Sequence, residues 1–252
     1  MKKLVFIFLI LISFFGFAQN KALFEKGNKA YNDADYDEAS KNYLKIIENG
    51  EESAELYFNL GNVYYKQNQI APSIFYYEKA LLLKPNDQEI KNNLAYAQNM
   101  TLDAIAIMPE TGLSKIYKNA TSYLSFEQWA YTSIILMIVF VIGYLLYYFL
   151  TYATQKRIAF IISILCFFLG IITIIIAYSK YSEFNADQPA IVFQQEVIVK
   201  SEPNTRSDET FRLHEGTKVK VLEQLNDWKK IRIADGKTGW LSSESIKMLK
   251  DF

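Results

Sequence analysis

The chain of 252 residues has one histidine and one cysteine, and these shortages exclude most catalytic and metal-binding arrangements. A single histidine cannot supply the paired imidazoles common in zinc sites. The single cysteine, Cys166, lies inside a long apolar run. The sequence also lacks the glycine-rich loops that cradle phosphates or dinucleotides. We therefore expect a protein that is not an enzyme and that needs no cofactor and no metal.

The chain also lacks an excess of charge of either sign, with 27 basic and 27 acidic side chains. Residues 19–127 carry eleven basic and fifteen acidic side chains, and residues 187–252 carry eleven of each. Neither segment is the basic platform that nucleic acids require, so no nucleic-acid partner is expected. With only one cysteine, an exported chain would form no internal disulfide.

A short acidic run of Asp33, Asp35, Asp37 and Glu38 resembles part of a calcium-binding loop. It lacks the central glycine and the distal glutamate that such loops use. We interpret it instead as a turn followed by the start of a helix, where acidic side chains interact favourably with the helix dipole.

Two uncharged apolar runs, Trp129–Leu150 and Ile158–Tyr178, stand close together in the chain. Each has about the twenty residues that cross the hydrocarbon core of a bilayer. The second contains fourteen Ile, Leu and Phe residues, which favour insertion by about 4 to 8 kcal/mol. The pattern predicts a transmembrane hairpin with helices over 129–151 and 158–178 and a loop over 152–157. The alternative is a buried helix of a soluble domain.

The orientation of the hairpin follows from charge. Residues 1–18 have two lysines, an apolar core and a small residue at Ala18, which is typical of a cleaved secretory signal, an uncleaved anchor being the alternative. Lys156 and Arg157 lie between the two apolar runs, which the positive-inside rule places in the cytoplasm. We therefore expect a multi-pass protein of the inner (cytoplasmic) membrane, with both soluble parts facing the periplasm.

A repeat of thirty-four residues occupies the N-terminal part. At this offset the matching pairs are Phe24 and Phe58, Gly27 and Gly61, Asn28 and Asn62, Tyr31 and Tyr65, and Tyr43 and Tyr77. This period resembles tetratricopeptide (TPR) helix–turn–helix units. The resemblance implies an all-α array over 19–100, with units over about 20–53 and 54–87 and a capping helix from Gln88. Because two units are fewer than the usual three, the array is expected to need support from its cap, the adjacent segment, the membrane or a partner.

The TPR resemblance also implies a binding surface, because the first helix of each unit lines the concave face in this family. The residues that this places in a row, called the concave row below, are Phe24, Asn28, Tyr31, Phe58, Asn62, Tyr65, Asn92 and Tyr96. Asparagine side chains can hydrogen-bond the backbone of an extended peptide. The alternative is that the rings pack within the array and the asparagines are solvated. Phe24 stands where carboxylate-binding members carry lysine, which argues against capture of a C-terminal carboxylate.

Residues 101–128 join the array to the first apolar run. Leu113, Ile116, Tyr117 and Tyr123 form a sparse amphipathic stretch there. It fits either a helix on the membrane surface or an ordinary linker helix.

The C-terminal part, 187–252, changes to alternating apolar and polar residues, which is typical of half-buried strands. The order of Val197–Pro203, Gly216–Val221, Trp228–Ile231 and Asp235–Leu241 resembles the bacterial SH3-like family. That resemblance implies an all-β barrel and, in some members, recognition of peptidoglycan. Trp228 and Trp240 hold positions that are usually partly committed to packing, and His214 is expected to be a surface residue.

The order of parts is a signal, a TPR pair, a membrane hairpin and an SH3-like barrel. This order resembles the TPR proteins of Bacteroides aerotolerance operons (BatE type). The resemblance implies partners among von Willebrand factor A-domain membrane proteins and a role in aerotolerance or stress resistance. The leading hypothesis is a non-enzymatic membrane-anchored adaptor whose periplasmic TPR groove binds a protein partner. The alternative is a sensor that binds the cell wall through the SH3-like domain.

Overall fold

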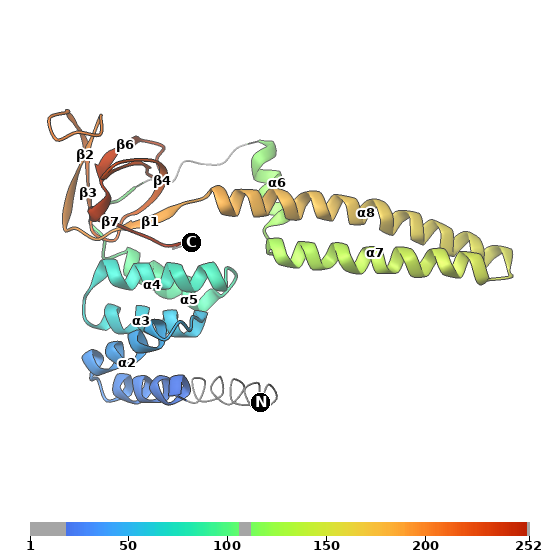
Figure 1. Ribbon diagram of the computed structural model, residues 1–252, viewed down its shortest axis with the longest axis horizontal. Helices are drawn as coiled ribbons and strands as arrows, with labels where there is room; N and C mark the ends of the chain where they lie inside the picture. Colours follow the sequence, from blue (N-terminus) through green and yellow to red (C-terminus); the bar gives the residue numbers. More distant parts are fainter. Residues whose placement is uncertain (1–18, 106–111, 251–252) are drawn as a thin grey trace, which may run out of the picture. The chain divides into compact units, whose positions relative to one another are not determined.

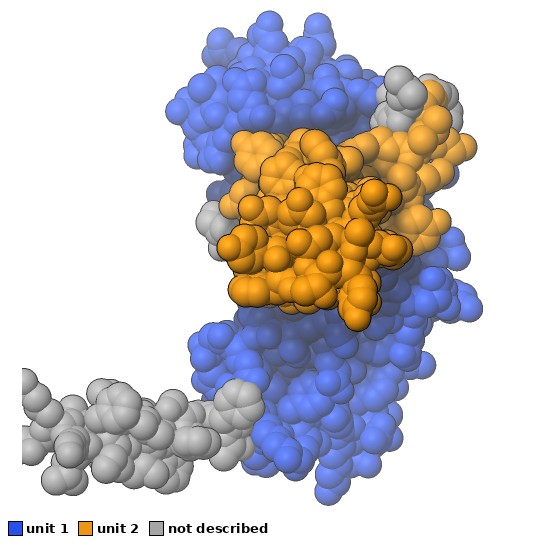
Figure 2. Space-filling model, turned by 90° about the vertical axis from the view of Figure 1, so that its right-hand side faces the viewer, with its two compact units in different colours: residues 1–108, 188–252 blue, residues 109–187 orange. Residues whose placement is uncertain are grey.

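The computed structural model describes residues 19–105 and 112–250, which belong to two compact units (Figure 2). Residues 1–108 together with 188–252 make the first unit, and residues 109–187 make the second. The expected signal over 1–18 lies outside the described residues, so cleavage after Ala18 stays a prediction.

The N-terminal half of the first unit is a set of antiparallel helices (Figure 1). Residues 19–32 are helical, and the following helices are α2 (Tyr36–Glu48), α3 (Ala54–Lys66), α4 (Ile70–Leu83) and α5 (Gln88–Gln98). Asp35, Ser53 and Asp87 cap the starts of α2, α3 and α5 with side-chain oxygens, the capping that these residue types favour. Pro85 follows the end of α4. The structure confirms two helix pairs and a fifth helix, and it places the acidic run at the start of α2.

A glycine on the first helix of each pair lets a buried tyrosine of the second helix come close. A Cβ atom on Gly27 would lie 2.5 Å from Tyr43 Cε1, and one on Gly61 would lie 2.5 Å from Tyr77 Cδ1. Both tyrosines are almost fully buried. The same contact thirty-four residues apart shows in three dimensions why the repeat contains glycine and tyrosine at these positions.

The C-terminal half of the first unit is a seven-stranded antiparallel sheet. Its elements are β1 (Pro189–Val192), β2 (Glu196–Lys200), β3 (Glu209–His214), β4 (Lys218–Leu225), β5 (Trp228–Arg232), β6 (Thr238–Ser242), the 3₁₀ turn η1 (Ser243–Ser245) and β7 (Ile246–Met248). The strand order is β3-β2-β6-β5-β4-β1-β7. Every strand contributes to one buried cluster, for example Val199 from β2, Ile231 from β5 and Ile246 from β7. The sheet therefore curls around a single core, as an SH3-like domain does.

The second unit contains α6 (Leu113–Thr121), α7 (Phe126–Phe149) and α8 (Ala153–Ala186). The connection from α7 to α8 is shorter than the expected loop over 152–157, because α8 already begins at Ala153. Lys156 and Arg157 are therefore helical residues near the start of α8. Helix α8 also continues past residue 178 to Ala186, since the polar residues after the apolar run contain no helix breaker.

Small residues line the contact between α7 and α8. A Cβ atom on Gly143 would lie 3.2 Å from Ser163 Cβ, and one on Gly170 would lie 3.1 Å from Met137 Cε. The Ser163 hydroxyl donates a hydrogen bond of 3.0 Å to the carbonyl oxygen of Phe140. Small residues and hydroxyl bonds of this kind allow close packing of helices in lipid.

The outward faces of α7 and α8 are apolar. In the most apolar stretch of each helix, only 11% of the residues of α7 and 28% of those of α8 are buried. In a soluble protein, a core helix of this composition would be mostly buried. By length and composition both helices can cross a membrane.

Replacing Gly61 with alanine tests the glycine–tyrosine contact. Without a clash, alanine would stabilise an interior helical position by about 1 kcal/mol. Because the Tyr77 ring occupies the space of the new methyl group, we expect destabilisation of about 1 to 3 kcal/mol instead. Hydrogen–deuterium exchange of α3 and α4 in the detergent-solubilised chain measures this effect. Slower exchange in Gly61→Ala would show that the ring is free to move away.

Candidate partner-binding surfaces

Two residues of the concave row, Asn28 and Asn62, hold the helix pairs together. The Tyr43 hydroxyl donates a 2.6 Å hydrogen bond to Asn28 Oδ1, and the Tyr77 hydroxyl donates one of 2.6 Å to Asn62 Oδ1. Burial raises the pKa of Tyr43 to about 12 and also raises that of Tyr77, so both hydroxyls stay protonated and able to donate. The sequence did not assign this role, and it differs from simple solvation of the asparagines.

The rings of the concave row are largely occupied by packing in the array. Phe24 lies against Tyr43 with ring centroids 5.7 Å apart, and Phe58 lies against Tyr77 at 5.9 Å. Tyr31 is partly buried in the same core as Tyr43. Each of these three rings leaves part of its surface exposed, so a partner can contact them.

The end of the row on α5 is open. Tyr96 is 61% exposed, and Asn92, one turn earlier, is also exposed. Asn92 Oδ1 accepts a 3.0 Å hydrogen bond from Gln88 Nε2. Tyr65 on α3 is half-buried against the core. The structure therefore brings the row onto neighbouring helices, and its most accessible side chains lie on α5.

The barrel covers the last apolar face of the array, a contact that sequence reasoning missed. Ile191 and Leu249 of the barrel are buried in the same cluster as Ile74 and Phe75 of α4. The ring of Phe193, just after β1, lies 5.6 Å from that of Phe75. Helix α4 thus has α3 and α5 as helical neighbours and β1 as its contact with the sheet.

The turn between β3 and β4 fits closely against the array because it contains a glycine. Gly216 has φ +86°, and a Cβ atom there would lie 2.9 Å from both Ile74 Cδ1 and Thr101 Cγ2. Beside it, Lys218 Nζ forms an ion pair of 2.7 Å with Glu78 Oε2. Because Glu78 is only 7% exposed, this pairing satisfies a charge that would be costly to leave alone.

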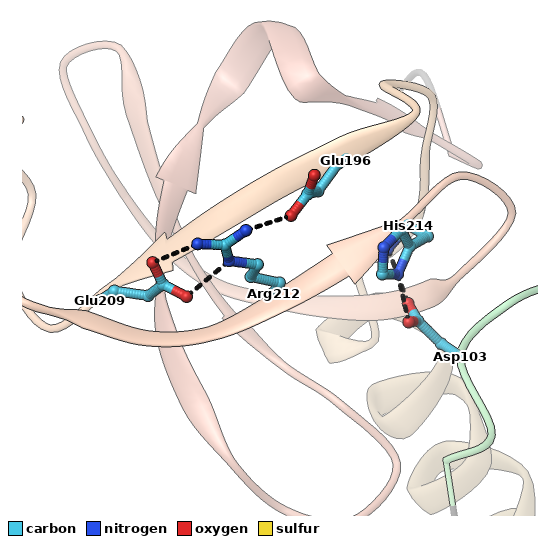
Figure 3. Close-up of polar contacts among 5 residues, drawn as sticks. All are labelled: Asp103, Glu196, Glu209, Arg212 and His214. Carbon is cyan, nitrogen blue, oxygen red and sulfur yellow. Dashed lines mark hydrogen bonds and ion pairs between the residues drawn. The ribbon is translucent and has the colours of Figure 1, made fainter.

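Asp103 joins the segment after α5 to the same turn (Figure 3). Its carboxylate accepts hydrogen bonds from the His214 backbone N–H at 2.7 Å and the Thr217 hydroxyl at 2.6 Å. The carboxylate also lies 2.7 Å from His214 Nδ1. An ionised carboxylate only accepts, so Nδ1 carries the proton. His214, which the sequence placed at the surface, has a side chain that is 30% exposed, and its bond to Asp103 was not predicted.

The environment of Asp103 shifts its acidity. Burial by itself raises the pKa of Asp103, but the hydrogen bonds from Thr217 and His214 outweigh burial and leave the pKa below its ordinary value. The contact therefore favours the ionised carboxylate. No pattern in the linker sequence marks Asp103, since its partners lie more than a hundred residues away.

An exposed ionic cluster lies on β2 and β3 near this contact (Figure 3). Arg212 is 2.7 Å from Glu196 and 2.7 Å from Glu209. The hydrogen bond from Arg212 lowers the pKa of Glu209. These groups are solvent-exposed, so the pairs orient the side chains and add little stability.

In the described part of the chain, no group of three or more His, Cys, Asp or Glu is placed to hold a metal ion. The arrangement offers packed surfaces, exposed side chains and a charged junction.

Residues 54–87 match the family model of the tetratricopeptide repeat, and residues 196–247 match that of the bacterial SH3 domain. Both families are interaction modules that are typically non-catalytic. The repeat match covers the second TPR repeat, and the first TPR repeat is the helix pair that precedes it. No curated protein matches the chain.

Replacing Tyr77 with phenylalanine removes one hydroxyl and leaves the ring. We expect a loss of about 1 kcal/mol in the local stability of α3 and α4, because Asn62 Oδ1 loses its bond. Tyr96→Phe is the matched control and should change nothing, since that ring is mostly exposed. Equal effects of the two changes on hydrogen exchange would contradict the assigned role of Asn62.

Replacing Asp103 with asparagine tests the junction through pH. The folded pKa of Asp103 is lowered, so its contribution to stability is present above the ordinary aspartate pKa of about 3.9. That contribution is lost as the pH falls through the lowered value. We expect Asp103→Asn to be less stable than wild type near neutrality and the difference in unfolding free energy to narrow as the pH falls below the ordinary aspartate pKa.

Denaturant unfolding of the detergent-solubilised chain at several pH values measures this gap. Asp33→Asn, which changes an exposed aspartate in a turn of the array, serves as the control. A constant gap across the acid range would show that the carboxylate charge does not contribute to the junction.

Proposed function

We propose that the chain is a non-enzymatic adaptor, anchored in the inner membrane, whose concave row binds a protein partner in the periplasm. The observation that carries this proposal is the TPR array, a module of protein–protein interaction, with exposed Asn92 and Tyr96 at its open end. Partly exposed aromatic rings give contact area to a partner at low entropic cost.

The contact between array and barrel supports placing both on the same side of the membrane. The array precedes the two apolar helices in the chain, and the barrel follows them. Ile191 and Leu249 can pack with Ile74 only if the array and the barrel lie in one compartment. An even number of crossings meets this condition. Lys156 and Arg157, close to the turn between α7 and α8, favour a cytoplasmic turn and therefore a periplasmic array and barrel.

The order of parts supports a more specific proposal. Its resemblance to the TPR proteins of Bacteroides aerotolerance operons suggests an envelope complex with von Willebrand factor A-domain membrane proteins. The role would be aerotolerance or stress resistance, with the array as the site that holds the partner.

Binding of peptidoglycan by the barrel is the second candidate. The bacterial SH3 match favours it. Trp240, however, is only 8% exposed, and Lys230 Nζ lies 5.8 Å from the centre of its ring. This ring therefore has little free face for stacking on a sugar, and we rank the wall-binding sensor below the adaptor.

Crosslinking in intact cells, followed by affinity purification of the full-length chain, tests the adaptor. We expect one protein to be captured by the wild type and reduced at least about fivefold in the variant Asn92→Ala/Tyr96→Ala, because a central aromatic contact contributes 1 kcal/mol or more. Leu83→Ala is the matched control, since Leu83 is 50% exposed on α4, outside the concave row. Capture that is unchanged in the double variant would exclude the concave row.

Sedimentation of the detergent-solubilised chain with purified peptidoglycan separates the two candidates. A pure adaptor stays in the supernatant. Sedimentation together with unchanged capture in Asn92→Ala/Tyr96→Ala would favour the sensor.

A further inference from the structure

A cleft of about 450 Å³ lies where the array meets the barrel. One side is apolar and is formed by Ile70 at the start of α4 together with Met100 and Leu102 after α5. Leu102 is 77% exposed, so its side chain is accessible to a ligand. The volume is within the range of sites that hold small ligands or single side chains.

The residues of the barrel that line the cleft are polar or acidic. They are Gln195, Glu196, His214 and Glu215. Asp103 holds the Nδ1 side of the His214 ring, which fixes the orientation of the ring. Glu196 is paired with Arg212, whereas the side chain of Glu215 has no ion pair within the described residues.

The charges around the cleft are unbalanced. Two carboxylates, those of Glu196 and Glu215, line the cleft, and no lysine or arginine among the described residues lines it. Glu196 is paired with Arg212, which Glu209 shares, so Glu215 gives the cleft a negative charge that can attract a cation. A ligand with an aliphatic stem and a cationic end would match both sides of the cleft.

The cleft adjoins the concave row. Ile70 and Met100, which line the cleft, also lie beside Tyr65 and Ala97. Tyr65 belongs to the concave row. A peptide that lies along the row and over these apolar residues would reach the cleft.

We propose that this cleft is a specificity pocket that receives a lysine or arginine side chain from an extended segment of the protein partner. The aliphatic stem packs on Met100 and Leu102, and the cationic end lies between Glu196 and Glu215. The proposal rests on the proposed function, because it takes the partner to be a peptide in the concave row. It adds the chemistry of one residue of that partner.

The test uses the fact that His214 is the only histidine of the chain. In a full-length chain without a histidine tag, ¹³C-labelled histidine gives a single ring signal that reports on the cleft. The probes are an acetylated and amidated Ala-Leu-Lys-Leu-Ala peptide and its neutral analogue with norleucine in place of lysine. We expect the lysine peptide to shift the ring signal in a saturable manner and to bind about fivefold more tightly than the analogue.

Three variants decide the outcome. Glu215→Gln should weaken binding of the lysine peptide about three- to fivefold and leave the norleucine peptide unchanged, while Leu102→Ala should weaken both peptides. Glu223→Gln, on exposed β4, is the matched control and should leave both unchanged. The proposal is overturned by equal affinity for the two peptides, or by a Glu215→Gln variant that binds the lysine peptide as wild type does.

Partner capture in cells distinguishes failure of the pocket from failure of the adaptor. If Asn92→Ala/Tyr96→Ala abolishes capture and Glu215→Gln does not weaken it, the concave row binds a partner and the pocket proposal alone is wrong. If neither change weakens capture, the adaptor proposal itself fails.

Discussion

A TPR array must cover the apolar face of its last helices, and in this chain the SH3-like barrel does so. The two repeats and helix α5 do not cover the side of α4 that carries Ile74 and Phe75. The barrel buries this side with Ile191 and Leu249. A terminal face of this kind needs a cover for the array to stay soluble. In many repeat proteins a polar-faced helix provides it. Here the cover comes from a domain that follows the array by almost ninety residues.

Close approach and charge both act at this contact. Gly216 lets the β3–β4 turn reach Ile74, because any side chain would collide with the array. On either side of that glycine, Asp103 binds His214 and Thr217, and Lys218 binds Glu78. The apolar contact contributes buried surface. The polar bonds fix the position of the turn on the array. Hydrogen-bonded charges at partly buried positions serve such positioning well.

The contact also links the two interaction modules. The array and the barrel belong to one compact unit although the two apolar helices separate them in the chain. A ligand that reaches the junction touches both modules, since the cleft there takes residues from each. The array and the barrel are thus parts of one compact unit and not two independent domains on a linker.

Local patterns in the sequence were enough to predict the elements. The thirty-four-residue period predicted the helix pairs, because the contact of Gly61 with Tyr77 and that of Gly27 with Tyr43 each join residues sixteen positions apart. Alternation of apolar residues such as Val197 and Val199 predicted strands, and two uncharged runs predicted α7 and α8. Hydropathy did not show where helix α8 ends, since the apolar run stops at residue 178 while helical hydrogen bonding continues to Ala186.

The sequence by itself therefore determined which parts the chain contains and the order in which they come. Only the tertiary structure decided that Asn28 and Asn62 accept hydrogen bonds from the tyrosines of their own repeats. It also decided that His214 is hydrogen-bonded to Asp103 and that a cleft exists at the junction. For the contacts of Asp103 and for the cleft, the physical reason is distance along the chain. Periodicity records contacts within a helix pair or a strand, whereas the partners of Asp103 lie 111 and 114 residues away, and no local pattern of residues encodes a contact of that kind.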